Sequence, residues 1–385
     1  MSIAWFIFVS LMIIGLQSYI YSRWGLSRVE YTRSFSEVAV FEGEEIKMTD
    51  EIANKKLLPI PWLRLEAKIN ENLQFKGQDQ EEQATSQDQS KQSEIIHGNY
   101  HRMLFSLLPY QRIRRQQNLV CTKRGFYHFE NVDLSTGDVF GFGESSENIP
   151  SPAEIIVYPS LISMDEVPLP THSWLGDVVV RRWIIEDPFL TAGVRDYAAG
   201  DPLNSIHWKA TARTNDLQVT KKDYSADHHL MIYVNFNQTG DIWHPIVDQQ
   251  LTEKSISYAA TIAEFAISKG ISTGFGCNSY IGQKTNETIR IEAENSRQQL
   301  TYIFETLAKI EVDANKSINS FLKEDIDHNI EGKDIIIVTA FVSDEMKESI
   351  RKIEALGNSV ELLMLESELI NKFREASEEG EYVAQ

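Results

Sequence analysis

The N-terminal run from Ile3 to Ser22 constrains this chain more than any other segment, because it contains no charged side chain. Twenty helical residues span roughly 30 Å, which matches the hydrocarbon core of a bilayer. Trp5 and Tyr21 belong to aromatic groups near the two ends, where amphipathic rings favour the headgroup region. A cleaved signal peptide would need a basic segment before the run and a small-residue cleavage site after it, and neither is present. We therefore expect a membrane anchor over residues 1–22.

The charges that flank this helix predict its orientation. Only the terminal amine precedes it, whereas Arg23, Arg28 and Arg33 follow it closely. Lysine and arginine near the end of a span favour the cytoplasmic side. We expect a single-pass protein of the cell membrane with its C-terminal body in the cytoplasm.

Length and charge limit what that body does. A chain of 385 residues exceeds the size at which a single core stops growing, so two folded domains are expected after the anchor. The net charge of −19 argues against nucleic acid, which proteins bind through Lys and Arg. Cys121 and Cys277 lie far apart and form no CxxC motif, so we expect neither a disulfide framework nor a zinc site. We expect the body to lie in a reducing compartment.

Residues 31–165 have the pattern of a β-sandwich. Residues 38–48 alternate around a turn at Gly43, and residues 62–69 alternate again. The segment 77–93 is rich in Gln, Ser and acidic residues and predicts a disordered loop between strands. The whole region resembles an immunoglobulin-like module more than a catalytic one.

Residues 226–385 change to alternating strands and helices. We expect strands at 229–235, 271–277, 334–339 and 359–365, a hairpin at 288–292, and helices at 248–269, 296–310 and 344–356. This order predicts a parallel, doubly wound sheet, so the fold class is a multi-domain α+β chain. A ligand of such a sheet is expected at the carboxyl ends of its strands, near 235–240, Cys277 and Ala340.

The connecting segment 166–225 contains the most distinctive motif, which runs from Arg195 to Arg213 and continues over 217–223. With Glu42-Gly43, Leu58 to Pro61, Arg124 to Tyr127 and Gly137 to Gly141, it resembles the domain-of-unknown-function 58 family over most of the chain. The resemblance implies a membrane-anchored bacterial protein with a β-sandwich and a von Willebrand factor A-like domain. It also implies two partners, a MoxR-type AAA+ ATPase and a transglutaminase-like membrane protein. This chain departs from the family in having one apparent membrane helix instead of two, and Asn204 where an arginine is usual.

The motif has two interpretations. Gly200 and Asp201 predict a tight turn, with Asp201 capping a short helix that Pro202 begins, and Lys209 and Arg213 then share a helical face. The segment is either a surface that holds a protein partner or an interdomain clasp, meaning that Arg195, Asp201 and Arg213 pair while Trp208 packs. We favour the clasp, because structural ion pairs imitate sites. The candidate residues are Arg195, Tyr197, Gly200, Asp201, His207, Trp208, Lys209 and Arg213.

The resemblance also suggests where a metal would bind. Von Willebrand factor A-like sheets usually bind a metal through D-x-S-x-S after the first strand, and the aligned residues here are Asn235, Asn237 and Thr239. Mg²⁺ prefers oxygen ligands that include a carboxylate, and this set has none. We expect no metal and no cofactor, although the loop is still a candidate for binding protein.

Three weaker signals favour structural roles. The segment 276–285 is a near miss to a phosphate loop, but its spacing fits a hairpin better. Cys277 with His228 or His229 is a poor nucleophile candidate, because it lies in an apolar strand. A basic cluster could face anionic lipid or an acidic partner, yet such residues are more often solvated strand faces. The cluster comprises Arg102, Arg112, Arg114, Arg115, Lys123 and Arg124.

Two functions remain from the sequence. The favoured one is a membrane-tethered, non-enzymatic adaptor or assembly factor whose C-terminal domain docks a protein partner such as the AAA+ ATPase. The alternative is a hydrolase with an unrecognised site at the carboxyl edge of the α/β sheet. No complete catalytic motif supports the alternative.

Overall fold

The computed structural model describes residues 2–76, 94–97, 100–168, 186–197, 206–214, 216–224, 229–239, 246–284, 287–367 and 369–370. The segment 77–93, expected to be disordered, lies outside these ranges. The chain forms two compact units, residues 1–161 with 304–310, and residues 162–303 with 311–385. Each unit is built on its own sheets, so each is described separately.

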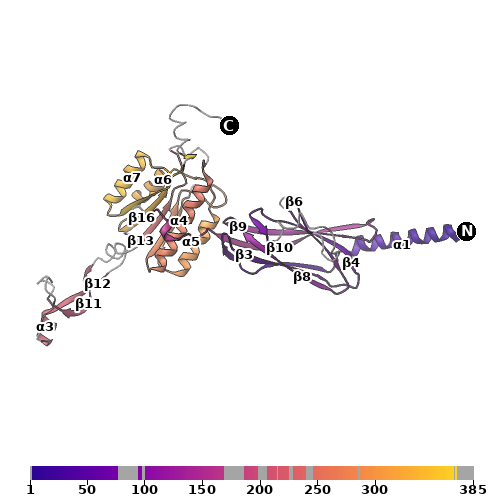
Figure 1. The fold of residues 1–385 in the computed structure, drawn as a ribbon, viewed down its shortest axis with the longest axis horizontal. Coiled ribbons are helices and arrows are strands. Elements are labelled where there is room, and N and C mark those ends of the chain that lie inside the picture. Colours follow the sequence, from indigo (N-terminus) through magenta and orange to yellow (C-terminus); the bar gives the residue numbers. More distant parts are fainter. Residues whose placement is uncertain are drawn as a thin grey trace, which may run out of the picture. The chain divides into compact units, whose positions relative to one another are not determined.

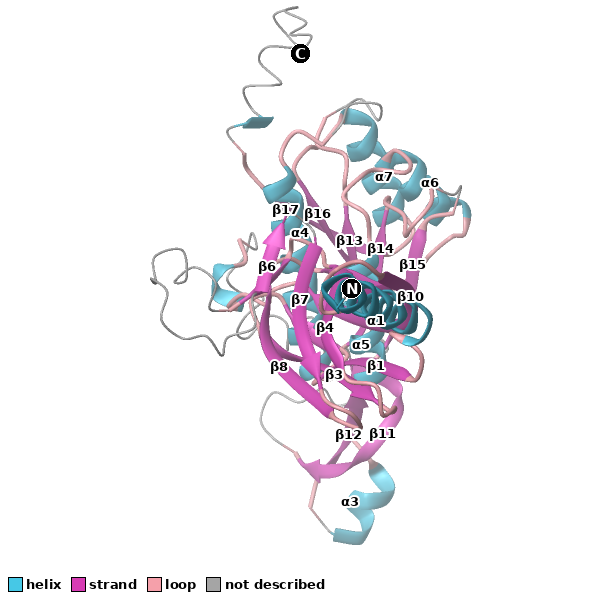
Figure 2. Ribbon diagram, turned by 90° about the vertical axis from the view of Figure 1, so that its right-hand side faces the viewer, coloured by secondary structure: helices cyan, strands magenta, loops and turns pink. Residues whose placement is uncertain are grey.

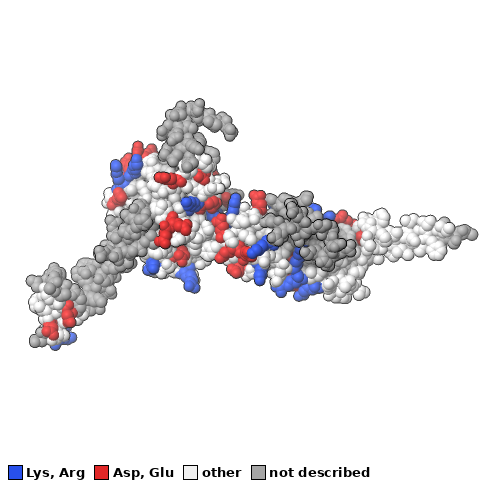
Figure 3. All heavy atoms as spheres, in the orientation of Figure 1, with Lys and Arg blue, Asp and Glu red and all other residues white. Residues whose placement is uncertain are grey.

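The first unit begins with helix α1 (Ser2–Trp24), which is long and apolar enough to cross a membrane over Trp5–Trp24. Most of its large apolar side chains are exposed, and Figure 3 shows the helix almost without charged atoms. Its last turns are different, because Tyr21 is buried. A Cβ at Gly143 would lie 2.6 Å from Ser18 Oγ, so the helix packs closely against the turn that contains Gly143. Figure 2 looks along α1, with the N-terminus toward the viewer.

Ten strands follow α1 and form two sheets (Figure 1). The four-stranded sheet has the order β1-β3-β8-β5, and the six-stranded sheet has the order β2-β10-β9-β4-β7-β6. Their bounds are β1 Val29–Phe35, β2 Ala39–Phe41, β3 Glu45–Asn54, β4 Ile60–Lys68, β5 Leu73–Phe75, β6 Glu94–His97, β7 Tyr100–Leu107, β8 Arg112–Cys121, β9 Gly125–Gly137 and β10 Glu144–Tyr158. The core clusters join inward residues of both sheets, such as Ile52 from one and Leu65 from the other. The predicted β-sandwich is therefore confirmed as two packed sheets.

The alternation along β1 places an arginine in this core. Val29, Tyr31 and Arg33 share the inward face of the strand. Arg33 Nε lies 2.8 Å from Asp50 Oδ1, and the Tyr31 hydroxyl donates to the same oxygen at 2.6 Å. Burial raises the pKa of Tyr31. Arg33 is thus a structural charge of the folded sandwich, and only Arg23 and Arg28 of the three flanking arginines stay exposed.

A buried lysine joins the sandwich to the end of α1. Lys56 Nζ donates to the carbonyl oxygens of Gly25 and Ser27, the latter at 2.9 Å. Its side chain has no carboxylate among these partners, and burial lowers the pKa of Lys56 to about 8. The ammonium replaces some of the hydrogen bonds that the carbonyls past the helix end would make with water.

The second unit contains a two-stranded sheet and a five-stranded sheet. A 3-10 turn, η1 (Met164–Glu166), precedes the small sheet, which pairs β11 (Glu186–Asp196) with β12 (Gln218–Tyr224) around helix α3 (Trp208–Thr214). The large sheet has the order β15-β14-β13-β16-β17. Its elements are β13 His229–Val234, α4 Gln249–Ser268, β14 Ser272–Cys277, β15 Ile289–Glu294, α5 Arg297–Lys309, α6 Ile318–Asp327, β16 Lys333–Thr339, α7 Asp344–Ala355 and β17 Ser359–Met364.

The topology of the large sheet follows the predicted alternation of strands and helices. β13 pairs in parallel with β14 and β16, β17 is parallel to β16, and only the edge strand β15 is antiparallel. Tyr233 and Ile337 face α6 and α7, whereas α4 contacts the same strands from the other face. The chain winds from β13 toward β15 and then returns to β16 on the other side of β13. Helix α6 was not predicted.

The Arg33 and Asp50 pair predicts a large loss of stability on removing one partner. Asp50→Ala leaves a buried guanidinium without its carboxylate, so the free energy of unfolding of the sandwich should fall by about 3–5 kcal/mol. Denaturant-dependent hydrogen exchange of β1 and β3 measures this change in the full chain. Glu30→Ala removes a partner of the exposed Lys55–Glu30 pair and is the control, with a loss within about 0.5 kcal/mol. Equal losses in the two variants would contradict a structural role for the buried pair.

Lys56 predicts a pH dependence with a definite sign. Its folded pKa of about 8 lies below the ordinary 10.5, so the folded state releases this proton first as pH rises. The unfolded state then binds more protons between these values, and the free energy of unfolding contributed by Lys56 increases with pH. The same hydrogen-exchange measurement at several pH values should show this increase in the natural chain and not in Lys56→Met. Parallel pH profiles for the two proteins would be inconsistent with the lowered pKa.

Candidate functional site

The carboxyl edge of the five-stranded sheet brings together two of the predicted site residues and two that were not predicted. Asn235 directly follows β13, Asn278 directly follows β14, and Thr339 ends β16. The strand order reverses at β13, so these residues lie where open α/β sheets usually place a ligand. Asn235, Asn237, Asn278 and Thr339 are all buried. We call these four residues the amide cluster.

Hydrogen bonds within the amide cluster occupy its oxygen atoms. Asn235 Oδ1 accepts from Asn237 N at 2.9 Å and from Asn278 Nδ2 at 3.3 Å. Asn237 Oδ1 accepts from Asn278 Nδ2 at 2.7 Å and from Ile318 N at 2.9 Å. Each carbonyl oxygen has two lone pairs, so both of these oxygens are fully used.

The Thr339 hydroxyl completes the amide cluster in the same way. Thr339 Oγ1 accepts from Asn235 Nδ2 at 2.9 Å and from Phe341 N at 3.2 Å. It donates to Phe341 O at 2.6 Å. A cation would have to displace N–H donors to reach these oxygens. Among the described residues, no group of three or more His, Cys, Asp or Glu is arranged to hold a metal ion.

Asn278 ties the cluster to the neighbouring loops. Its Oδ1 accepts from Phe236 N at 2.8 Å, and its Nδ2 also donates to Lys316 O at 2.9 Å. The signal that could have identified it is its position directly after a buried strand, in the same register as Asn235. The prediction named the neighbouring Cys277 instead, and that thiol is buried within β14.

The loop after Asn237 is fixed to α4 by a second set of bonds. Gln238 Oε1 accepts from Val247 N and Asp248 N, both at 2.8 Å, and Gln238 Nε2 donates to Thr252 Oγ1 at 2.9 Å. Asp248 Oδ1 caps α4 by accepting from Leu251 N at 3.0 Å. Thr239, the third predicted residue of the loop, is half-buried at the end of this fixed segment.

The described residues of the signature motif belong to β11, α3, β12 and the residues that adjoin them. Arg195 pairs with Val219 across β11 and β12, and Tyr197 N donates to Leu217 O at 2.9 Å. His207 N donates to Gln218 O at 2.8 Å, and His207 Nδ1 accepts from Ala210 N at 3.1 Å. His207 therefore begins α3 and fastens it to β12.

One prediction about this motif differs from the structure. Helix α3 begins at Trp208 after the His207 cap, and the helix start predicted at Pro202 lies outside the described residues. Trp208, expected to pack in a clasp, is 68% exposed. Lys209 and Arg213 are exposed and one helical turn apart, as predicted. Gly200 and Asp201 lie outside the described residues, and the burial of Arg195 is not described.

The basic cluster is not one free surface. Arg102 lies 2.6 Å from Glu66 and Arg112 lies 3.1 Å from Glu51, so carboxylates offset both charges. Arg124 is buried. Arg112 and Cys121 are the two ends of β8, about 30 Å apart along the strand, so the cluster extends over the length of the sandwich.

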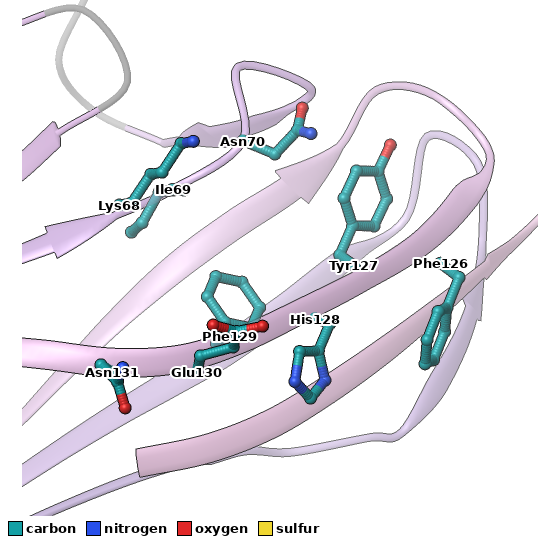
Figure 4. A pocket seen from close by; sticks show the side chains of 9 residues that line it. All are labelled: Lys68, Ile69, Asn70, Phe126, Tyr127, His128, Phe129, Glu130 and Asn131. Carbon is teal, nitrogen blue, oxygen red and sulfur yellow. The ribbon is translucent and has the colours of Figure 1, made fainter. Parts of the chain in front are cut away.

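A hollow on the sandwich is as large as a ligand site, but its polar side chains do not converge on one point. It has a volume of about 680 Å³ and is lined by residues 68–70 and 126–131. Figure 4 shows Tyr127 and His128 pointing to opposite sides of β9, as alternation along a strand requires. His128 Nδ1 lies 3.2 Å from Glu154 Oε1, and burial raises the pKa of Tyr127 to about 12. These groups do not meet around a common point.

The amide cluster predicts that Asn278 is needed for the fold of the second unit. Asn278→Ala leaves the Phe236 N–H and three buried oxygens without this partner, so the free energy of unfolding should fall by about 2–4 kcal/mol. Asn295→Ala is the matched control, because its amide donates to Gly270 O at 2.8 Å on the exposed surface. Hydrogen exchange of β13 and β16 compares the two variants. A loss for Asn278→Ala no larger than for Asn295→Ala would contradict this account.

Solved structures similar to parts of this chain carry no argument about function. A non-cellulosomal cohesin from Archaeoglobus fulgidus has 11% identity and a TM-score of 0.24, and the match covers 36% of this chain and 95% of the cohesin. Native alpha-2-macroglobulin from Escherichia coli, from domain MG7 to the C-terminus, has 10% identity and a TM-score of 0.26. That match covers 34% of this chain and 24% of the other. Scores this low leave the fold to be judged from the sheets described above.

The sequence comparisons point to a family without an assigned activity. A protein of Bacillus subtilis (strain 168) described as "Uncharacterized protein YeaD" is 19% identical over 345 residues, which cover 89% of this chain and 78% of that protein. Its alignment includes most of the sandwich as well as the second unit. The family match is confined to the part of the chain that holds α3 and the amide cluster. Residues 193–366 match the family model described as "Protein of unknown function DUF58".

Proposed function

We propose that this chain is a membrane-tethered, non-enzymatic adaptor or assembly factor that presents its second unit to a protein partner. The observation that carries the proposal is the state of the amide cluster. Its oxygens are filled by N–H donors at the sheet edge where a ligand is expected, and Asn235, Asn237 and Thr339 bring no carboxylate there. Binding by surface complementarity fits this arrangement better than chemistry at a metal.

We regard the second unit as a von Willebrand factor A-like domain and the first as an immunoglobulin-like sandwich. The order β15-β14-β13-β16-β17, with helices on both faces, supports a von Willebrand factor A-like second unit. Two packed sheets, whose strands pair mostly antiparallel, support an immunoglobulin-like first unit. In this view Asn278 Nδ2 donates to the Asn235 and Asn237 side-chain oxygens, so hydrogen bonds occupy atoms that would otherwise be available to hold an ion.

The proposed placement is the cell membrane, with α1 as a single span and the rest of the chain in the cytoplasm. The length and hydropathy of α1 support a span. Arg23 and Arg28 are exposed just after it and favour the cytoplasmic side. Arg33 is buried after folding, but it still counts during insertion, when the chain has not yet folded.

The exposed face of α3, made of Trp208, Lys209 and Arg213, is the proposed contact for the partner. An exposed tryptophan beside two cations is typical of binding hot spots, which are enriched in Trp and Arg. The partner class we propose is a MoxR-type AAA+ ATPase, with a transglutaminase-like membrane protein as a further member of the assembly. Lys209 and Arg213 make this face basic although the chain as a whole is acidic, so the face favours a partner with a local acidic patch.

The proposal predicts that one surface substitution separates binding from folding. Full chain in lipid nanodiscs should capture a MoxR-type ATPase from the same organism, and Trp208→Ala should weaken capture by about thirtyfold, as loss of a hot spot of about 2 kcal/mol would. Melting temperature should not change, because Trp208 is 68% exposed. Tyr302→Ala, which truncates a 57% exposed aromatic on α5, is the control and should bind normally.

Two outcomes would refute the adaptor function. One is that no such ATPase is captured with or without nucleotide. The other is a substrate turnover that stays with the chain through purification to homogeneity. If Trp208→Ala and the natural chain captured the ATPase equally, the contact on α3 would be wrong, and the adaptor would have to bind through another surface.

A further inference from the structure

Three turns of the sandwich gather around the end of α1. They are residues 55–59 between β3 and β4, residues 108–111 between β7 and β8, and residues 138–143 between β9 and β10. We call them the basal turns. The Asn54 side chain donates to Leu58 O and Leu108 O, both at 3.0 Å, which joins the first two turns. Lys56 binds the carbonyls after α1, and Gly143 abuts Ser18 of the helix.

The basal turns expose large apolar side chains that nothing in the fold covers. Six such side chains are between 57% and 75% exposed: Leu57, Leu108, Tyr110, Val139, Phe140 and Phe142. The chain as a whole has 56 acidic residues, yet the only acidic residue in these turns is Asp138, which is buried. A soluble surface of an acidic protein would have carboxylates here.

The backbone holds these side chains outward. Asp138 Oδ1 accepts from Gly143 N at 2.9 Å, and Trp62 Nε1 donates to Asp138 O at 3.2 Å, which closes the β9–β10 turn. Gly141 has a φ of +76°, which only glycine adopts at low cost. Tyr110 has a φ of +57°, an uncommon conformation for a tyrosine. Hydrogen bonds and specific backbone angles therefore fix the course of these turns, which determines where the exposed rings are attached.

The length of α1 indicates what covers the basal turns. If the sandwich stood clear of the membrane, only Trp5 to Gln17 of the candidate span Trp5–Trp24 would be free to cross, and this part of the helix reaches roughly 20 Å, less than the hydrocarbon core. Using the apolar residues up to Ser22 brings the adjoining turns about 5–10 Å into the boundary between headgroups and acyl chains. Aromatic rings such as Phe140 and Tyr110 favour that depth.

We propose that the basal turns are immersed in the lipid interface and that, with α1, they form one rigid membrane-embedded base. Figure 1 shows α1 entering the sandwich at one end, so a bilayer crossed by α1 meets that end first. Two motifs singled out in the sequence, Leu58 to Pro61 and Gly137 to Gly141, contribute to these turns. The inference rests on the proposed membrane span of α1, and it adds a second lipid contact to that span.

Depth-dependent quenching in the full chain tests the base. Cys121 and Cys277 are buried, so a thiol-reactive NBD probe should label only an introduced surface cysteine under native conditions. The variants are Phe140→Cys in a basal turn, Leu11→Cys within α1 and Val38→Cys. Val38 is the matched control, because it is a 67% exposed apolar residue at the opposite end of the sandwich. Each protein is reconstituted in phosphatidylcholine and phosphatidylglycerol vesicles that contain nitroxide lipids.

The expected result distinguishes the base from the anchor. The probe at 140 should be quenched by nitroxides placed near the headgroup and should show blue-shifted emission. The probe at 11 should be quenched by nitroxides near the ends of the acyl chains. The probe at 38 should be unaffected. Quenching at 11 without quenching at 140 would overturn the base and leave the anchor, with the turns then free for a protein partner. Absence of quenching at 11 would refute the membrane span, and the base with it. Quenching at all three sites would show nonspecific adsorption and would also overturn the base.

Discussion

The hydrogen bonds of Asn278 connect the parts of the second unit on which its shape depends. One side chain contacts the loop after β13 through Phe236 N, the side chain of Asn237, and the segment before α6 through Lys316 O. These contacts join three segments at the edge where the strand order reverses, an edge that enzymes leave open for a ligand. Because these polar groups satisfy one another, hydrogen bonds hold the described part of this edge together. A rigid scaffold is what a binding surface displayed from neighbouring elements needs.

Both units bury polar side chains, but these side chains have different structural roles in the two units. In the sandwich, Arg33 and Asp50 place a charge pair between the sheets, with the guanidinium carbon 5.9 Å from the Tyr31 ring centre. A pair of this kind contributes little net stability, but removing one partner is costly, so it selects one register of β1 on β3. In the amide cluster of the second unit the buried groups are neutral amides and a hydroxyl, for which the cost of desolvation is smaller. The first arrangement fixes strand pairing, and the second fixes the loops around a potential site.

The sequence predicted the elements whose pattern is local. The apolar run before Arg23, the alternation around Gly43 and the strand and helix alternation after His229 all correspond to elements of the structure. Helix α6 was missed because it is short, although Ile318, Phe321 and Leu322 have helical spacing after the Ser317 cap. Asn278 was missed because its role depends on residues 38 to 43 positions away, which periodicity does not reveal. The exposure of Trp208 was missed for a related reason, since a tryptophan is expected to pack and only the hairpin geometry decides which way it points.

The long strands of the first unit have a consequence for distance. β10 starts at Glu144, beside the turn that abuts α1, and ends at Tyr158, where it pairs with Phe41. Fifteen residues of strand at about 3.3 Å each, shortened by the bulge near Pro150, separate these ends by more than 40 Å. If α1 crosses a bilayer and moves with the sandwich as one body, the length of the sandwich sets how far from the bilayer the chain continues after Tyr158. Shortening β9 and β10 in step would lower that height without touching a single binding residue.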